Sequence, residues 1–78
     1  MDFTTFNKIK DIVDVYSREY IVGNRKDLGV FMEIINIDEE KKEFLLCELD
    51  KKMPLGVIFT HDYNNGRLKI VFRSWFVW

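Results

Sequence analysis

The sequence has few cysteine and histidine residues, which stabilise many small proteins through disulfides or bound metal ions. Its 78 residues include one cysteine and one histidine, so an intrachain disulfide is excluded, and so is a zinc site built from these two residue types. We expect no metal and no cofactor. A single cysteine suits a reducing compartment, and the sequence therefore predicts a cytoplasmic protein.

Long apolar runs and an excess of one charge sign are also absent. No apolar run approaches the roughly 20 residues of a membrane span, and the opening MDFTTFNKIK lacks the apolar core of a signal peptide. With 12 basic and 13 acidic residues the net charge is −1, which provides no electrostatic attraction for duplex DNA. These features predict a soluble chain that forms one domain over residues 1–78.

Aromatic residues, in contrast, are abundant. Seven Phe, three Tyr and two Trp are present. A chain of this length buries only roughly 60% of its unfolded surface, so its stability depends on such large apolar side chains.

The clearest structural signal is the stretch Leu55–Trp78, which predicts a β-hairpin. Asn65-Gly66 supplies the two residues tolerant of positive φ that a type I′ turn requires. Folding about this pair sets Asn64 opposite Arg67. A three-residue loop would slip the register by one and bring charged side chains onto the apolar face, so we reject it.

In this register the hairpin has an apolar face and a mixed face, because side chains alternate along a strand. The apolar face collects Leu55, Val57, Phe59, His61, Tyr63, Leu68, Ile70, Phe72 and Phe76. The mixed face collects Gly56, Ile58, Thr60, Asp62, Lys69, Val71, Arg73, Trp75 and Val77. The last strand ends in four apolar residues, WFVW, and we predict that it forms an edge of the sheet.

The N-terminal part of the chain has the apolar spacing of an amphipathic helix. Phe6, Ile9, Val13, Tyr16 and Tyr20 recur at intervals of three and four residues. The spacing predicts a helix from about Phe3 to Tyr20 or Val22, with Gly23 at its C-terminal cap.

The middle of the chain allows two interpretations. Val30–Ile37 is rich in β-branched residues and predicts a strand. Residues 38–50 form either the second strand of a hairpin, over Phe44–Leu49, or a helix that Asp38 caps. We favour the hairpin, because the successive apolar residues Phe44-Leu45-Leu46-Cys47 would leave a helix without a polar side.

Together these elements predict an α+β fold, with an N-terminal amphipathic helix packed on one face of a four-stranded antiparallel meander (αββββ). The alternative order, α-β-α-β-β, applies if residues 38–50 are helical. No internal repeat is visible. One helix covers one sheet face, so we expect apolar area to remain exposed on the other face. It would come from the hairpin and from one of two sets, either Ile35, Ile37, Phe44 and Leu46 or Met32, Ile34, Cys47 and Leu49.

No arrangement of residues points to catalysis, and we expect no enzyme. His61 falls on the apolar face of the hairpin, where we expect a half-buried structural residue. Cys47 falls within an apolar run, where we expect packing rather than reactivity. The carboxylates of the segment DEEKKE are interleaved with lysines and lack the spacing of a calcium loop.

Function is therefore inferred from surfaces. We predict a small protein–protein interaction module of regulator or inhibitor type, which docks on another protein, or on a second copy of itself as a homodimer. It would use the exposed sheet face and the aromatic C-terminal strand. Aromatic and arginine side chains dominate interface energies, so the predicted partner-binding residues are Arg73, Trp75, Phe76 and Trp78.

The alternative function is the binding of single-stranded nucleic acid. Trp75 would stack on bases, while Arg67, Lys69 and Arg73 would contact the phosphate backbone. The balanced charge of the chain disfavours this alternative.

Overall fold

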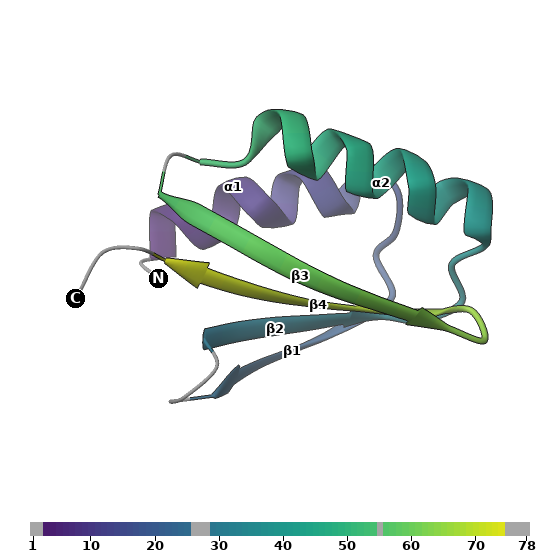
Figure 1. Cartoon of the computed structure of the whole chain (residues 1–78). Coiled ribbons are helices and arrows are strands. Elements are labelled where there is room, and N and C mark those ends of the chain that lie inside the picture. The colour runs from purple at the N-terminus through teal and green to yellow at the C-terminus, as the bar shows by residue number, and fades with distance from the viewer. Residues whose placement is uncertain (1–2, 26–28, 55, 75–78) are drawn as a thin grey trace.

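The computed structural model describes residues 3–25, 29–54 and 56–74, which form two layers of secondary structure. The elements are helix α1 (Phe3–Asp14), strands β1 (Tyr20–Arg25) and β2 (Gly29–Ile34), helix α2 (Glu39–Lys52), and strands β3 (Val57–Asn64) and β4 (Arg67–Ser74). The strands form one antiparallel sheet in the order β1-β2-β4-β3. Both helices lie on the same side of this sheet (Figure 1).

The α+β class, the N-terminal helix and the four-stranded antiparallel sheet are confirmed. The element order needs correction, because the chain forms a helix and a hairpin twice, as αββαββ. The alternative α-β-α-β-β has the second helix but omits β1. The fold therefore contains a structural repeat that is not visible in the sequence, and its two halves meet where β2 pairs with β4.

The prediction that the last strand is an edge is wrong. β4 lies between β2 and β3, and the edges of the sheet are β1 and β3. The helix-side residues of β4, Leu68, Ile70 and Phe72, are fully buried. A central position between two strands and under two helices is the one that buries such a strand best.

Helix α1 ends at Asp14, earlier than the apolar spacing predicts. The amide groups of Tyr16 and Ser17 both donate to the carbonyl of Val13 at 2.9 Å, which closes the last turn. Tyr20 pairs instead with Ile34 in the sheet. Tyrosine, isoleucine and valine favour strands, so pairing with β2 prevails over the helical spacing.

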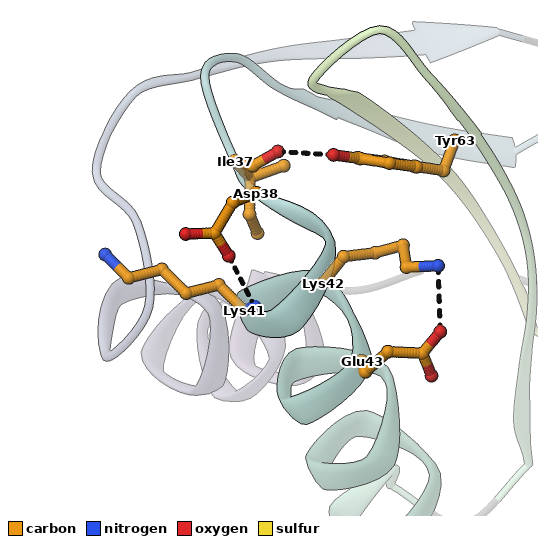
Figure 2. Close-up of polar contacts among 6 residues, drawn as sticks. All are labelled: Ile37, Asp38, Lys41, Lys42, Glu43 and Tyr63. Atoms are coloured by element: carbon orange, nitrogen blue, oxygen red, sulfur yellow. Dashed lines mark hydrogen bonds and ion pairs between the residues drawn. The ribbon is translucent and has the colours of Figure 1, made fainter.

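The hairpin predicted for residues 38–50 is wrong, since this segment forms α2. Asp38 caps the helix in an extended conformation (φ −78°, ψ 168°), and its Oδ1 accepts a hydrogen bond of 2.7 Å from the Lys41 amide (Figure 2). The apolar run does not prevent the helix, because Leu45 is buried whereas Phe44 and Cys47 are exposed.

The predicted register of the β3–β4 hairpin is confirmed within the described residues. The ladder runs from Asn64–Arg67 to Val57–Ser74, and both turn residues have positive φ, 50° at Asn65 and 79° at Gly66. The core consists of the buried residues Ile9, Val13, Met32, Ile34, Ile37, Leu45, Leu49, Val57, Leu68, Ile70 and Phe72. It lies between the helices and one face of the sheet.

Two hydrogen bonds tie the hairpin to the segment that leads into α2. The Ile37 amide donates to the carbonyl of Gly66 at 2.9 Å. The hydroxyl of Tyr63 donates to the carbonyl of Ile37 at 2.8 Å (Figure 2). β2 ends at Ile34, before the predicted Ile37, and Asn36 has the left-handed φ of 58° that turns the chain toward the helix.

Candidate functional site: the open face of the sheet

The face of the sheet that points away from both helices is the main exposed feature of the fold. No described element covers it (Figure 1). Cross-strand partners point to the same side, so the register defines its members. We call these residues the open face: Ile21, Gly23, Phe31, Glu33, Ile58, Thr60, Asp62, Asn64, Arg67, Lys69, Val71 and Arg73.

An apolar row crosses the middle of the open face. Gly23, Phe31, Val71 and Thr60 are successive partners on β1, β2, β4 and β3. The Phe31 ring lies across Gly23, because a Cβ atom at position 23 would be 2.2 Å from Phe31 Cε1. Phe31 and Val71 are half-buried, so the centre of this row is partly sheltered by its neighbours.

A charged row runs beside the apolar row. Glu33, Lys69 and Asp62 are partners on β2, β4 and β3, so the lysine is flanked by two carboxylates. Glu33 Oε2 also accepts a hydrogen bond of 3.0 Å from Arg67 Nη1. Lys69 Nζ is 5.5 Å from the centroid of the Phe31 ring, close enough for a cation–π contact.

Exposed apolar side chains lie at the two ends of the open face. Ile21 on β1 is 53% exposed and Ile58 on β3 is 45% exposed. Arg73, the partner of Ile58 on β4, is also exposed. In the part of the chain that the structure describes, Arg73 has no ion pair.

The structure places some of the predicted partner-binding residues and not others. Arg73 lies on the open face, as predicted from the alternation of the hairpin. The other three, Trp75, Phe76 and Trp78, lie outside the described residues. Arg67 and Lys69, predicted for the alternative function, share the open face with Arg73.

Sequence reasoning missed the contribution of β1 to this face and left open which side of β2 would contribute. Met32 and Ile34 belong to one of the two sets that the sequence allowed on the outer side, and they are buried under the helices. Phe31 and Glu33, which alternate with them, point outward. Ile37, a member of the other set, lies beyond the end of β2 and is also buried. The alternation within β2 could have grouped these residues, but only the pairing with β4 shows which group faces outward.

The single histidine and cysteine lie on the helix side, near the β3 edge. Both side chains are exposed, which corrects the half-buried histidine and the packed cysteine expected from the sequence. They line a groove between α2 and β3 of about 350 Å³, with Lys42, Glu43, Leu46, Asp50 and Phe59. Among the described residues, no cluster of three or more His, Cys, Asp or Glu side chains is arranged to hold a metal.

The described groups with shifted pKa values lie in the helices or on the helix side of the sheet, and none lies on the open face. Lys42 Nζ lies 2.9 Å from Glu43 Oε1 (Figure 2), which raises the pKa of Lys42 and lowers that of Glu43. A hydrogen bond to Glu48 raises the pKa of Lys52. These are ion pairs at the surface, and neither favours a general acid or base.

Comparison with protein-family models, curated proteins and solved structures finds no match to this chain. Within the described residues, no helix has both the length and the apolar character needed to cross a bilayer.

Proposed function

We propose that this chain is a small, non-enzymatic interaction protein of regulator or inhibitor type, which binds another protein through the open face. The observation that carries the proposal is the apolar row of Phe31 and Val71 with charged residues beside it. Protein interfaces have this anatomy, with an apolar centre and a polar rim. A single cysteine suits action in the cytoplasm.

The chemistry of the open face favours a partner with an acidic and partly apolar surface. Three described cations, Arg67, Lys69 and Arg73, face two carboxylates, Glu33 and Asp62. Both carboxylates already have cationic neighbours, whereas Arg73 lies beside the exposed Ile58. A partner that places a carboxylate and an apolar side chain here would pair the arginine and cover the isoleucine.

The sequence also predicts that the chain can bind a second copy of itself and form a homodimer. Self-association is compatible with the proposed function as long as it leaves the open face accessible. Pairing at an edge of the sheet would meet this condition, because edge contacts use backbone groups in the plane of the sheet.

Single-stranded nucleic acid is the second candidate, because three cations lie on one face of β4 beside the Phe31 ring. The flanking carboxylates make it the weaker candidate, since they would repel phosphates. A titration with labelled oligonucleotides at low salt separates the two. Tight binding there, weakened by Lys69→Ala and Arg73→Ala and falling steeply with salt, would favour nucleic acid over a protein partner.

The experiment for the protein partner uses charge reversal on the open face. Proteins captured from the native host by the wild type are identified, and each is purified and titrated against the variants. We expect Arg73→Glu and Ile58→Glu to weaken binding at least about tenfold, since hot-spot losses are about 2 kcal/mol or more.

A matched control is available on the helix side. Phe44 is 56% exposed on α2, so Phe44→Glu makes a similar substitution away from the open face and should leave the affinity unchanged. A partner whose affinity falls with Phe44→Glu but not with Arg73→Glu and Ile58→Glu would contradict the proposal. Circular dichroism and denaturant unfolding establish that each variant is folded.

A further inference from the structure

We propose that β3 is a homodimerisation edge, at which a second copy of this chain adds its own β3 in antiparallel orientation. The two sheets would join into one continuous sheet. This inference does not depend on the function proposed for the open face, because the edge uses outward-pointing backbone groups and leaves the open face accessible.

Strand β3 lacks the features that normally protect an edge. It is the outermost strand beside β4 (Figure 1), and its ladder runs without a bulge from Val57 to Asn64. Its sequence, VIFTHDYN, contains no lysine, arginine or proline. Natural proteins use such residues, bulges or short strands to prevent edge pairing. The other edge, β1, is shorter and contains Gly23 and Arg25.

Half of the backbone hydrogen-bonding groups of β3 point outward from this edge. In a hairpin with a two-residue turn, the closing pair Asn64–Arg67 exchanges both backbone hydrogen bonds, and bonded pairs then alternate along the ladder. The amide and carbonyl groups of Phe59, His61 and Tyr63 therefore point away from β4. Among the described residues, no turn or loop backbone group bonds to them.

Strand β3 is also complementary to itself in one antiparallel register. With His61 on the two-fold axis, Phe59 faces Tyr63 of the second copy, and every outward group of these three residues has a partner. On the open-face side, Thr60 faces Asp62 of the second copy. The hydroxyl can donate to the carboxylate, and the two carboxylates do not face each other.

Neighbouring registers are less favourable. With Phe59 on the axis, Val57 would have to pair, but its amide already donates to the carbonyl of Pro54 at 3.2 Å. With Thr60 on the axis, the exposed Ile58 would face the Asp62 carboxylate of the second copy. The register centred on His61 avoids both conflicts.

The groove between α2 and β3 provides space for the side chains that arrive on the helix side. It has a volume of about 350 Å³, and its lining includes Leu46 and Phe59. Phe59 and Tyr63 of the second copy would enter this side of the sheet, because cross-strand partners point the same way. The added strand would thus cover apolar side chains as well as satisfy backbone groups.

The first test measures the oligomeric state by sedimentation equilibrium. We expect the wild type to form a dimer and His61→Lys to raise its dissociation constant at least about tenfold, because two like charges would meet on the axis. Val22→Lys is the matched control at the β1 edge, since Val22 is 44% exposed there. A wild type that stays monomeric at the highest concentration reached, or a dimer insensitive to His61→Lys, would overturn the proposal.

The second test identifies the register by disulfide formation in a Cys47→Ser background. Thr60→Cys and Asp62→Cys, each carrying a tag of different size, should form a linked heterodimer on mixing and oxidation. In the proposed register these residues face each other in a non-hydrogen-bonded pair with Cα atoms about 4.5 Å apart, within disulfide range. Each variant by itself should stay unlinked. Linkage of Thr60→Cys to itself, or no linkage in the mixture, would refute the His61-centred register.

Discussion

The aromatic ring of Phe31 lies across the backbone of Gly23, its partner on the neighbouring strand. A Cβ atom at position 23 would be 2.2 Å from Phe31 Cε1 and 2.3 Å from Phe31 Cζ, so the absence of a side chain makes room for the ring. The central aromatic residue of the open face thus depends on a glycine in another strand.

Replacing Gly23 with alanine should therefore displace the Phe31 ring. We expect the fold to persist with a loss of about 1–3 kcal/mol in the free energy of unfolding, because overpacking forces the ring from its position. A double-mutant cycle with Phe31→Ala checks this cause, since Gly23→Ala should cost less by about 0.5 kcal/mol or more when the ring is already absent. Purely additive losses would show that the ring is not what opposes the new methyl group.

Two other glycines should differ in their tolerance of alanine, although both have positive φ. At Gly66 (φ 79°) the nearest atom to a new Cβ is the Ile37 carbonyl oxygen at 3.9 Å, so the cost should be the left-handed strain of about 1–2 kcal/mol. At Gly29 (φ 87°) the Cβ would be 2.4 Å from the Phe72 carbonyl oxygen, which is backbone of the central strand. Gly29→Ala should therefore destabilise the protein clearly more in denaturant unfolding. Equal losses would contradict the close approach of β2 and β4 at this point.

Removing the Tyr63 hydroxyl should loosen the connection between the hairpin and the segment before α2. Its hydrogen bond to the Ile37 carbonyl is 2.8 Å long and part-buried, so Tyr63→Phe should lower the free energy of unfolding by about 1 kcal/mol. Tyr16→Phe is a suitable control, because the Tyr16 hydroxyl has no hydrogen bond within the described residues. A cost for Tyr16→Phe as large as that for Tyr63→Phe would argue against a specific role of this bond.

We expect the protein to lose stability at alkaline pH, because the Tyr20 hydroxyl has a raised pKa in the folded state. Burial of the phenol and its 2.7 Å hydrogen bond to Asp14 raise the pKa of Tyr20 from 10.0 to about 12. The folded state therefore keeps this proton after the unfolded chain has released it. The stabilisation is fully present below about pH 10 and is lost as the pH rises through about 12.

Unfolding of Tyr20→Phe and the wild type across this pH range measures the effect. The free energy of unfolding of the wild type should fall with pH in part because Tyr20 loses its proton, and Tyr20→Phe should lack this part of the fall. The difference in free energy of unfolding between wild type and variant should therefore shrink as the pH rises from about 10 to 12. Any other group that changes protonation in this pH range is common to both proteins, and the difference removes its contribution. A difference that stays constant with pH would mean that the pKa of Tyr20 is not raised in the folded state.

The sequence by itself determined the hairpin of β3 and β4. The Asn65-Gly66 pair selects a two-residue turn, and the alternation on either side has one register that keeps Lys69 and Arg73 away from the core. Within the described residues, the register and the two faces followed correctly because these signals are local. The position of Arg73 on the open face followed for the same reason.

Only the tertiary structure decided the end of α1, the strand β1 and the choice of a helix for α2. Tyr20–Arg25 carries a helical spacing at its start and forms a strand, because β2 offers it a partner. The segment after Asp38 has apolar residues on all sides and still forms α2. Leu45 and Leu49 are buried against the sheet, whereas Phe44 is exposed to solvent. Propensity and spacing could not resolve these choices, since the burial of each side chain depends on strands that are distant in sequence.

The open face and the β3 edge were decided in the same way. Inserting α2 between the hairpins allows β4 to pair with β2, which places β4 at the centre and leaves β3 outermost. That one pairing sets Phe31 beside Val71 and Glu33 beside Lys69. No local pattern encodes it, because the choice between neighbouring strands rests on the total apolar surface that each arrangement buries.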